Sequence, residues 1–107
     1  RIDWKRSAAE IDAMIRAYTP WPLSWTMEGG RKLIILKSVP DDEWNARPEN
    51  RSAEPGKILG VDKKRGILIQ TGEGILVVSA LQYQARKALD FQAFLNGERH
   101  FLSTKLE

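Results

Sequence analysis

The feature that most constrains the fold is a series of three short apolar runs in the second half of the chain. They cover residues 57–62 and 67–71 and a third run that starts at Ile75, and they are rich in Ile, Leu and Val. Only Lys63-Lys64-Arg65-Gly66 and Gly72-Glu73-Gly74 separate them. These spacers suit hairpin turns and are too short for a helix, so the runs are predicted to be consecutive strands. For the same reason the Gly-x-Gly sequence is interpreted as a turn and not as a phosphate-binding loop.

Two more strands are predicted before them, over Ser24–Glu28 and Arg31–Val39. Gly29-Gly30 lies between these segments and can supply the positive φ angles of a type I′ turn. Short strands with tight turns, and helices only near the ends, predict a mainly β protein. We expect a small OB-like β-barrel of five or six strands, with an N-terminal helix and a short C-terminal helix. Residues 98–101 are a candidate for the sixth strand.

The N-terminal helix is predicted from a capping box, Ser7-Ala8-Ala9-Glu10, and an apolar face with helical spacing. It must end near Tyr18, because Pro20 disfavours the helical conformation at the residue before it. The short C-terminal helix is expected over Phe91–Asn96, with Asp90 as its N-cap. The expected core includes Ile11, Ile15, Leu33, Ile35, Val77 and Leu81.

Trp21 and Trp25 allow two interpretations. They could stack on nucleotide bases, or one of them could fill the space between the first helix and the barrel. We predict the second arrangement, because a tryptophan buries a large apolar area.

The length of 107 residues fits one domain, 1–107, in which residues 1–19 form a linker and the first helix. There is no cysteine, which excludes thiol catalysis, disulfides and zinc–thiolate sites. The lone His100 has no partner nearby in sequence, and the acids Asp41-Asp42-Glu43 lack metal-ligand spacing. The acids are expected in a surface loop over 41–54. No catalytic residue and no metal site are therefore predicted.

No apolar run is long enough to cross a bilayer, and no signal-peptide pattern opens the chain. We expect a soluble cytoplasmic protein with no membrane association. Seventeen Lys and Arg residues against fourteen Asp and Glu residues give a net charge of +3, which is mild for a nucleic-acid-binding protein. Taken by itself, the segment that contains Arg86-Lys87 is interpreted as an ordinary solvated loop, because Lys and Arg are usually exposed.

Several motifs, taken in order, resemble the C-terminal domain of bacterial methionyl-tRNA formyltransferases, and the resemblance covers almost the whole chain. In the first half they are Ile2-Asp3-Trp4, Ile15-Arg16-Ala17-Tyr18 and especially Pro20-Trp21-Pro22-Leu23-Ser24-Trp25. In the second half they are Pro55-Gly56-Lys57-Ile58-Leu59, Gly66-Ile67, Thr71-Gly72-Glu73-Gly74, Leu81-Gln82, Lys87-Ala88 and Leu95-Asn96-Gly97.

The resemblance implies an OB-like barrel that follows a larger catalytic domain. In that family the catalytic domain binds 10-formyltetrahydrofolate and carries the acid–base residues for formyl transfer, and the barrel grips the initiator methionyl-tRNA used in translation initiation. None of those catalytic residues is in this chain. We therefore expect no cofactor in this domain and no formyl transfer by these residues alone.

The resemblance also places Arg86-Lys87 at the family's basic pair, and the family usually has glycine where Ala85 stands here. If that position needs a positive φ angle, alanine is strained there. Basic residues in turns are expected to contact tRNA phosphates without reading bases. The candidate RNA-contacting residues are Arg86, Lys87, Lys63, Lys64, Arg65, Arg31 and Lys32.

Two alternatives remain open from the sequence. The parent protein could be another folate-dependent formyltransferase, acting on a sugar or another amine, in which the barrel only shapes the substrate cleft. The chain could also be an unrelated OB-like interaction module. Salt-dependent tRNA binding would distinguish the domain of a methionyl-tRNA formyltransferase from both of these alternatives.

Overall fold

The computed structural model describes residues 1–41 and 54–107. Of the loop predicted over 41–54, Asp41 is the last residue of a strand, and residues 42–53 lie outside the described residues. The helices are α1 (Ala8–Tyr18), α3 (Phe91–Gly97) and the short 3-10 helix η2 (Phe101–Ser103). The strands are β1 (Ser24–Glu28), β2 (Arg31–Asp41), β3 (Ile58–Asp62), β4 (Gly66–Gln70), β5 (Ile75–Tyr83) and β6 (Leu89–Asp90).

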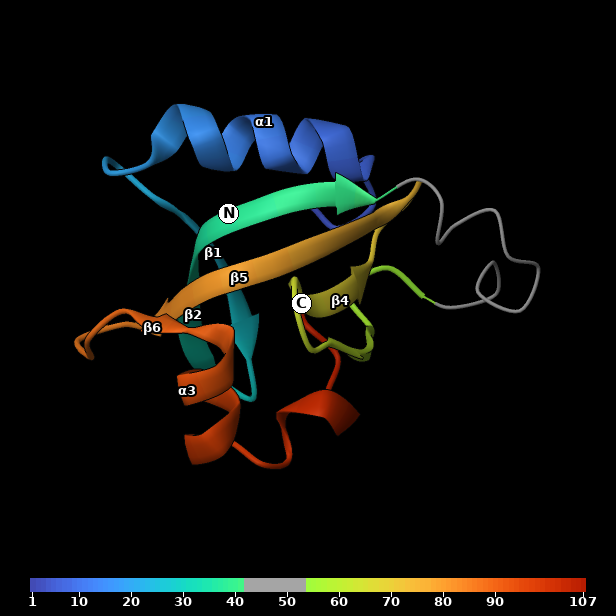
Figure 1. Cartoon of the computed structure of the whole chain (residues 1–107). Helices are drawn as coiled ribbons and strands as arrows, with labels where there is room; N and C mark the ends of the chain where they lie inside the picture. The colour runs from blue at the N-terminus through green and yellow to red at the C-terminus, as the bar shows by residue number, and fades with distance from the viewer. Residues whose placement is uncertain (42–53) are drawn as a thin grey trace.

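The strands form one antiparallel sheet in the order β1-β2-β5-β4-β3, and β6 pairs with β5. The mainly β prediction is confirmed, including six strands, an N-terminal helix and a short C-terminal helix. The sheet does not close on itself, so the molecule is barrel-like and not a closed barrel. Figure 1 shows the curved sheet, with α1 on one side and α3 on the opposite side.

The C-terminal tail lies between the two edge strands. Leu106 N–H donates to the Gly56 carbonyl at 2.8 Å, next to β3, and Glu107 N–H donates to Met27 of β1 at 3.1 Å. The Thr26 hydroxyl also donates to the Glu107 carbonyl, at 2.7 Å. The tail thus satisfies edge groups that the open sheet leaves unpaired.

Helix α1 begins at the predicted capping box, in which Ser7 and Glu10 exchange hydrogen bonds. The helix is fastened to the sheet by Asp12, which is buried and accepts a hydrogen bond from the Ser38 hydroxyl of β2 at 2.8 Å. Arg16, one turn later, donates to the other oxygen of Asp12 at 2.9 Å. The buried carboxylate therefore has a partner for each oxygen.

The core contains the predicted residues, all of them at most 1% exposed: Ile11, Ile15, Leu33, Ile35, Val77 and Leu81. The tryptophan prediction is wrong for Trp21, which is 82% exposed. Trp25 is half-buried, and Arg1 and Lys32 contact its ring. The buried tryptophan is Trp4, which is 4% exposed and donates its indole N–H to Thr26 at 2.9 Å.

The C-terminal segment differs from the prediction in one respect. Residues 98–101 form no strand, because the chain turns there into η2. The sixth strand is β6, which was not predicted and is only two residues long. Asp90 caps α3 as predicted, accepting from Ala93 N–H at 2.8 Å. Among the described residues, no helix is long and apolar enough to cross a membrane.

Candidate nucleic-acid interface

The predicted basic pair Arg86-Lys87 lies in the turn between β5 and β6, and both residues are exposed. Backbone hydrogen bonds fix the turn: Gln84 N–H donates to Lys32 at 3.0 Å, and Arg86 N–H donates to Tyr83 at 3.0 Å. The Gln82 side chain donates to the Arg86 carbonyl at 2.5 Å. These bonds leave the basic side chains on the outside of a defined turn.

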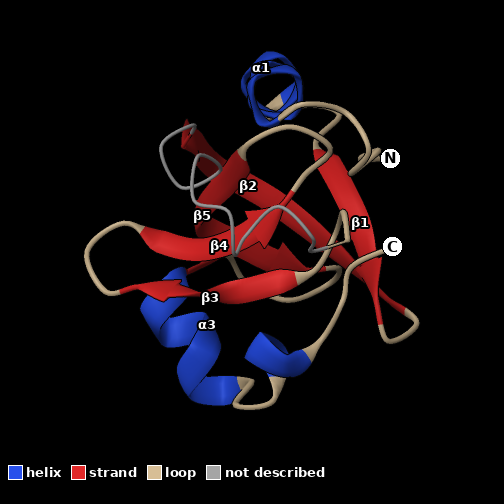
Figure 2. Ribbon diagram, turned by 90° about the vertical axis from the view of Figure 1, so that its right-hand side faces the viewer, coloured by secondary structure: helices blue, strands red, loops and turns tan. Residues whose placement is uncertain are grey.

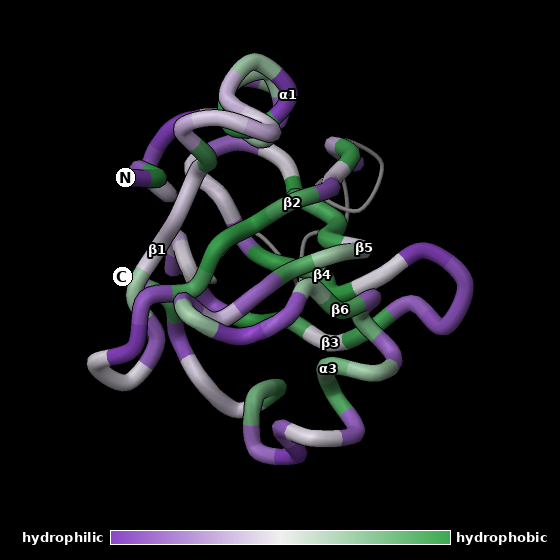
Figure 3. The backbone as a smooth tube through the Cα atoms, turned by 90° about the vertical axis from the view of Figure 1, so that its left-hand side faces the viewer, coloured by the Kyte–Doolittle hydropathy of each residue, from purple (hydrophilic) through white to green (hydrophobic). Residues whose placement is uncertain are grey.

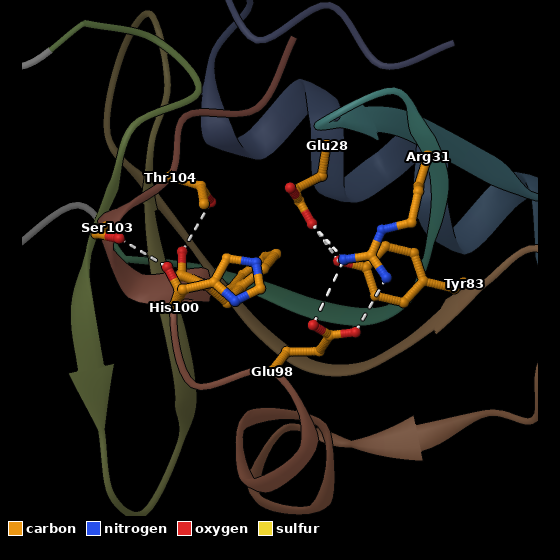
Figure 4. Close-up of polar contacts among 8 residues, drawn as sticks. Glu28, Arg31, Tyr83, Glu98, His100, Ser103 and Thr104 are labelled. Atoms are coloured by element: carbon orange, nitrogen blue, oxygen red, sulfur yellow. Dashed lines mark hydrogen bonds and ion pairs between the residues drawn. The ribbon is translucent and has the colours of Figure 1, made fainter.

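A polar cluster of Glu28, Arg31, Tyr83 and Glu98 lies at the end of β5, where the turn begins (Figure 4). The buried Tyr83 hydroxyl donates to Glu28, which is itself 5% exposed. Arg31 lies over the Tyr83 ring, with its guanidinium carbon 3.9 Å from the ring centroid. It pairs with Glu28 at 3.0 Å and with Glu98 at 3.1 Å, so one cation joins the β1–β2 hairpin to the end of α3.

The cluster shifts the protonation equilibria of its members. Burial raises the pKa of the Tyr83 hydroxyl, and the hydrogen bond to Glu28 raises it further. The hydrogen bond to Glu98 is the main reason that the pKa of Arg31 is raised. Tyr83 therefore stays neutral at physiological pH and donates to the carboxylate. Because the charge of Arg31 is shared by two carboxylates, it adds little free positive potential.

Lys32 lies on the next position of β2, with its ammonium 4.4 Å from the centroid of the Trp25 ring. Together with Arg31 and Arg86 it lines a hollow of about 330 Å³, which we call the hairpin hollow. The full lining of the hairpin hollow is Gly30, Arg31, Lys32, Tyr83, Gln84 and Arg86. Three of the seven predicted cations therefore meet at one concave site.

The other predicted group lies in the β3–β4 turn. Asp62 accepts backbone hydrogen bonds from Lys64 at 2.9 Å and Arg65 at 3.2 Å, which shapes the turn. Those contacts, chiefly that of Lys64, lower the pKa of Asp62. The Arg65 side chain pairs with Asp62 at 3.0 Å and with Asp41 at 2.8 Å, so its charge is offset. Lys63 and Lys64 are exposed in the same turn.

The seven cations do not form one patch. Figure 2 shows the β1–β2 turn and the β3–β4 turn on opposite sides of the sheet. Figure 3 shows hydrophobic positions in the central strands and mostly hydrophilic positions at the turns. A ligand that touches both groups must be long enough to reach across the domain.

The described residues contain no group of three or more His, Cys, Asp or Glu side chains that could hold a metal ion. His100 is exposed in the turn before η2, where its backbone carbonyl accepts from the Ser103 hydroxyl at 2.8 Å. A second hollow, of about 660 Å³, lies between the N-terminal segment and the C-terminal tail and is lined by Trp4 and Leu106 among others. It contains none of the predicted cations.

Sequence comparison identifies the family. Residues 1–99 match the protein family described as "Formyl transferase, C-terminal domain". The chain belongs to this family. It is also similar to a protein of Treponema denticola named methionyl-tRNA formyltransferase, with 48% identity over 107 residues. That match covers 99% of this chain and 33% of the relative, so the chain spans about a third of the relative's length.

The family membership confirms the resemblance seen in the sequence and rules out an unrelated OB-like module. The polar cluster was missed, although part of its signal is local. Glu28 and Arg31 flank the Gly-Gly turn and face each other across the hairpin, where opposite charges attract. The contributions of Tyr83 and Glu98 come from distant segments, and nothing local in the sequence points to them.

Proposed function

We propose that these 107 residues form the C-terminal domain of a methionyl-tRNA formyltransferase and bind the phosphate backbone of tRNA. The 48% identity along the whole chain supports the assignment of the parent protein. The observation that carries the proposed tRNA contact is the hairpin hollow, which Lys32 and the exposed Arg86 both line. Lys87 extends the same basic surface.

The proposed contact is electrostatic. Cations in turns neutralise phosphates and release condensed counterions, which gives affinity without base recognition. Arg31 acts here mainly by supporting the hollow, because it is held by two carboxylates. Lys63 and Lys64 provide a second contact on the other side of the domain, within reach of a molecule as long as tRNA, and Arg65 holds their turn in place.

The chemistry of the reaction belongs to another part of the protein. We assign 10-formyltetrahydrofolate, formyl transfer and their acid–base residues to a catalytic domain that precedes this one. No catalytic residue is predicted from the sequence of this chain, and the chain covers only 33% of the relative from Treponema denticola, which leaves room for such a domain. The domain's task is to position initiator methionyl-tRNA for the formylation used in translation initiation in the cytoplasm.

The test is a salt titration of tRNA binding by the full-length protein and its Arg86→Ala, Lys87→Ala double variant. Removing two phosphate contacts should lower the slope of log affinity against log salt by roughly 1.5–2. Initiator and elongator tRNAs should be weakened about equally, because phosphate contacts carry no sequence information. The KM for tRNA should rise, with kcat nearly unchanged.

The matched control is Lys5→Ala, Arg6→Ala, which removes two adjacent exposed cations near the start of α1. This control should leave the salt slope unchanged. A Lys63→Ala, Lys64→Ala variant should weaken binding separately and add to the first, because the two pairs of cations lie in different turns, β3–β4 and β5–β6. An unchanged slope in the Arg86, Lys87 variant would contradict the proposed site. Activity without any salt-dependent tRNA binding would favour a parent enzyme that acts on a sugar or another amine.

A further inference from the structure

The loop from Tyr18 to Leu23, which joins α1 to β1, exposes a large apolar surface. Trp21 is 82% exposed and Tyr18 is 47% exposed, and Pro20 and Pro22 are also exposed. Figure 1 shows this loop extending from the end of α1, at the left of the view. A tryptophan in water is uncommon, and clustered exposed apolar residues mark interaction sites.

The loop is built to hold its shape. The backbone N–H and the hydroxyl of Thr19 both donate to the Ile15 carbonyl, at 3.1 and 2.7 Å. Leu23 N–H donates to the Tyr18 carbonyl at 2.7 Å, which closes the base of the loop. The prolines on each side of Trp21 restrict the backbone further. A side chain presented in this way loses little conformational entropy when it docks.

The chemistry of the loop favours an apolar protein surface as its partner. Residues 17–27 contain no charged residue, although 29% of the chain is charged. Arg16, the nearest cation before this run, is held by Asp12 at 2.9 Å. Sites that stack bases of a nucleic acid combine aromatics with cations that follow the backbone, and residues 17–27 supply no cation of their own. The cations Arg1 and Lys32 lie over Trp25, after the loop has ended.

The size of the patch favours a tethered partner. A stable interface between separate proteins buries about 800 Å² on each side, which is far more than one loop provides. A partner in the same polypeptide is present at an effective concentration in the millimolar range, so a small contact is sufficient. A second copy of this domain has no such advantage.

The start of the described chain lies close to this loop. Ile2 N–H donates to the Trp25 carbonyl at 2.7 Å, and Arg1 lies over the Trp25 ring at 5.6 Å. Trp25 and Trp21 are four residues apart, which is at most about 14 Å of backbone. Any residues that precede Arg1 therefore leave the domain near the base of this loop. The relative from Treponema denticola has room for a large additional part, since this chain covers 33% of it.

We propose that Trp21 and its loop dock on an apolar surface of the part of the full-length protein that precedes Arg1, and so fix the orientation of this domain. The proposal rests on the proposed function only for the existence of that preceding catalytic domain. It is independent of where tRNA binds. Docking buries the indole of Trp21 and limits the motion of the connecting segment.

The test is limited proteolysis of the full-length protein without tRNA, measured at the segment that precedes Arg1. Truncation of a buried tryptophan removes enough apolar contact to raise the open population roughly tenfold or more. Trp21→Ala should therefore speed cleavage of the connection by at least about tenfold, and Trp21→Phe should restore most of the protection. Val39→Ala is the matched control, because Val39 is 51% exposed on β2 and lies outside the loop. The protease should cleave this control variant at the same rate as the unmodified protein.

Three outcomes would overturn the proposal. The first is an unchanged cleavage rate in Trp21→Ala. The second is weaker tRNA binding by Trp21→Ala together with an unchanged rate of proteolytic cleavage without tRNA, which would mark Trp21 as an RNA contact. The third is protection that depends on protein concentration, which would mark an interface between copies. Failure of the tRNA site itself would appear instead in the Arg86, Lys87 variant, which should not alter cleavage.

Discussion

At the residue scale, Ala85 shows how a single position sets the geometry of the basic turn. Its φ angle is 68°, in the left-handed region that glycine adopts freely and alanine does not. The sequence raised this possibility because the resembled family usually has glycine there. The structure confirms that the turn needs the positive φ angle and keeps it with alanine, and Arg86 remains exposed.

We expect Ala85→Gly to raise the free energy of unfolding by about 0.5–1 kcal/mol, because it relieves the left-handed strain. Chemical denaturation measures this change. Ala88→Gly is the matched control in the same turn, and its φ angle is not positive. It should lower stability slightly, because glycine has more conformational freedom in the unfolded chain. Equal effects of the two substitutions would contradict the strain argument.

The tryptophans give the second prediction at this scale. Trp4 is 4% exposed in the main core cluster and bonded to Thr26, and Trp21 is 82% exposed. Trp4→Ala should lower the free energy of unfolding by about 3–5 kcal/mol through the cavity that it leaves. Trp21→Ala should change it by less than about 0.5 kcal/mol in the isolated domain. Urea denaturation of both variants tests the assignment, and a reversed order would refute it.

At the scale of elements, α1 is positioned by its two ends and one buried group. The capping box fixes the start, and Asp12 holds the middle to Ser38 of β2. Gly72 lies where the N-terminal segment crosses the β4–β5 turn, and a Cβ atom there would lie 1.8 Å from the Lys5 carbonyl oxygen. The turn and the segment before α1 can touch only because that position has no side chain.

The capping box predicts a pH dependence. The Ser7 backbone N–H is the main group that lowers the pKa of Glu10. A carboxyl with a lower pKa in the folded state stabilises above its unfolded pKa of about 4.3, and this contribution is lost as the pH falls. Glu10→Gln should therefore be less stable than the unmodified domain near pH 7, and the difference should shrink below about pH 4.

Melting temperatures of both forms, measured from pH 3 to 7, test this prediction. Ser7→Ala removes the other half of the box and should show the same loss of pH dependence. A difference between Glu10→Gln and the unmodified domain that stays constant over the whole range would show that the Glu10 carboxylate does not contribute through its charge.

At the scale of the whole molecule, the fold depends on a short tail that reaches both edges of an open sheet. Leu106 is 1% exposed and bonds to Gly56, and the next residue bonds to β1. Lys105 adds an isolated bridge with Lys57 and an ion pair with Glu54 at 2.5 Å. The unpaired backbone groups of an exposed edge strand can pair with another chain, so the tail also protects against aggregation.

We expect Leu106→Ala to cost about 2–5 kcal/mol and to speed hydrogen exchange in β1 and β3. Leu102→Ala is the matched control, because it removes the same atoms from a residue that is 36% exposed in η2. It should cost less than about 1 kcal/mol and leave exchange in β1 unchanged. Equal costs would show that the tail does not hold the two edges.

The sequence by itself determined the elements whose signals are local. Hairpin turns, the capping box and the Asp90 cap all involve residues within four positions of each other, so their spacing in the sequence shows their contacts. The alternation of apolar residues likewise identified buried positions such as Leu33 and Ile35. The same motifs carried the resemblance that the family match confirms.

Only the tertiary structure decided which tryptophan is buried, which cations are free and how the sheet ends. Glu98 neutralises Arg31 from 67 positions away, and Thr26 bonds to Glu107 from 81 positions away. Local sequence patterns do not predict such pairs, because these contacts form only when the tertiary fold brings distant segments together. Trp4 and Trp21 are equally apolar, and their burial is decided by which of them the folded sheet covers. The hairpin hollow exists for the same reason: it forms where two turns, distant in sequence, are brought together by the pairing of β2 with β5.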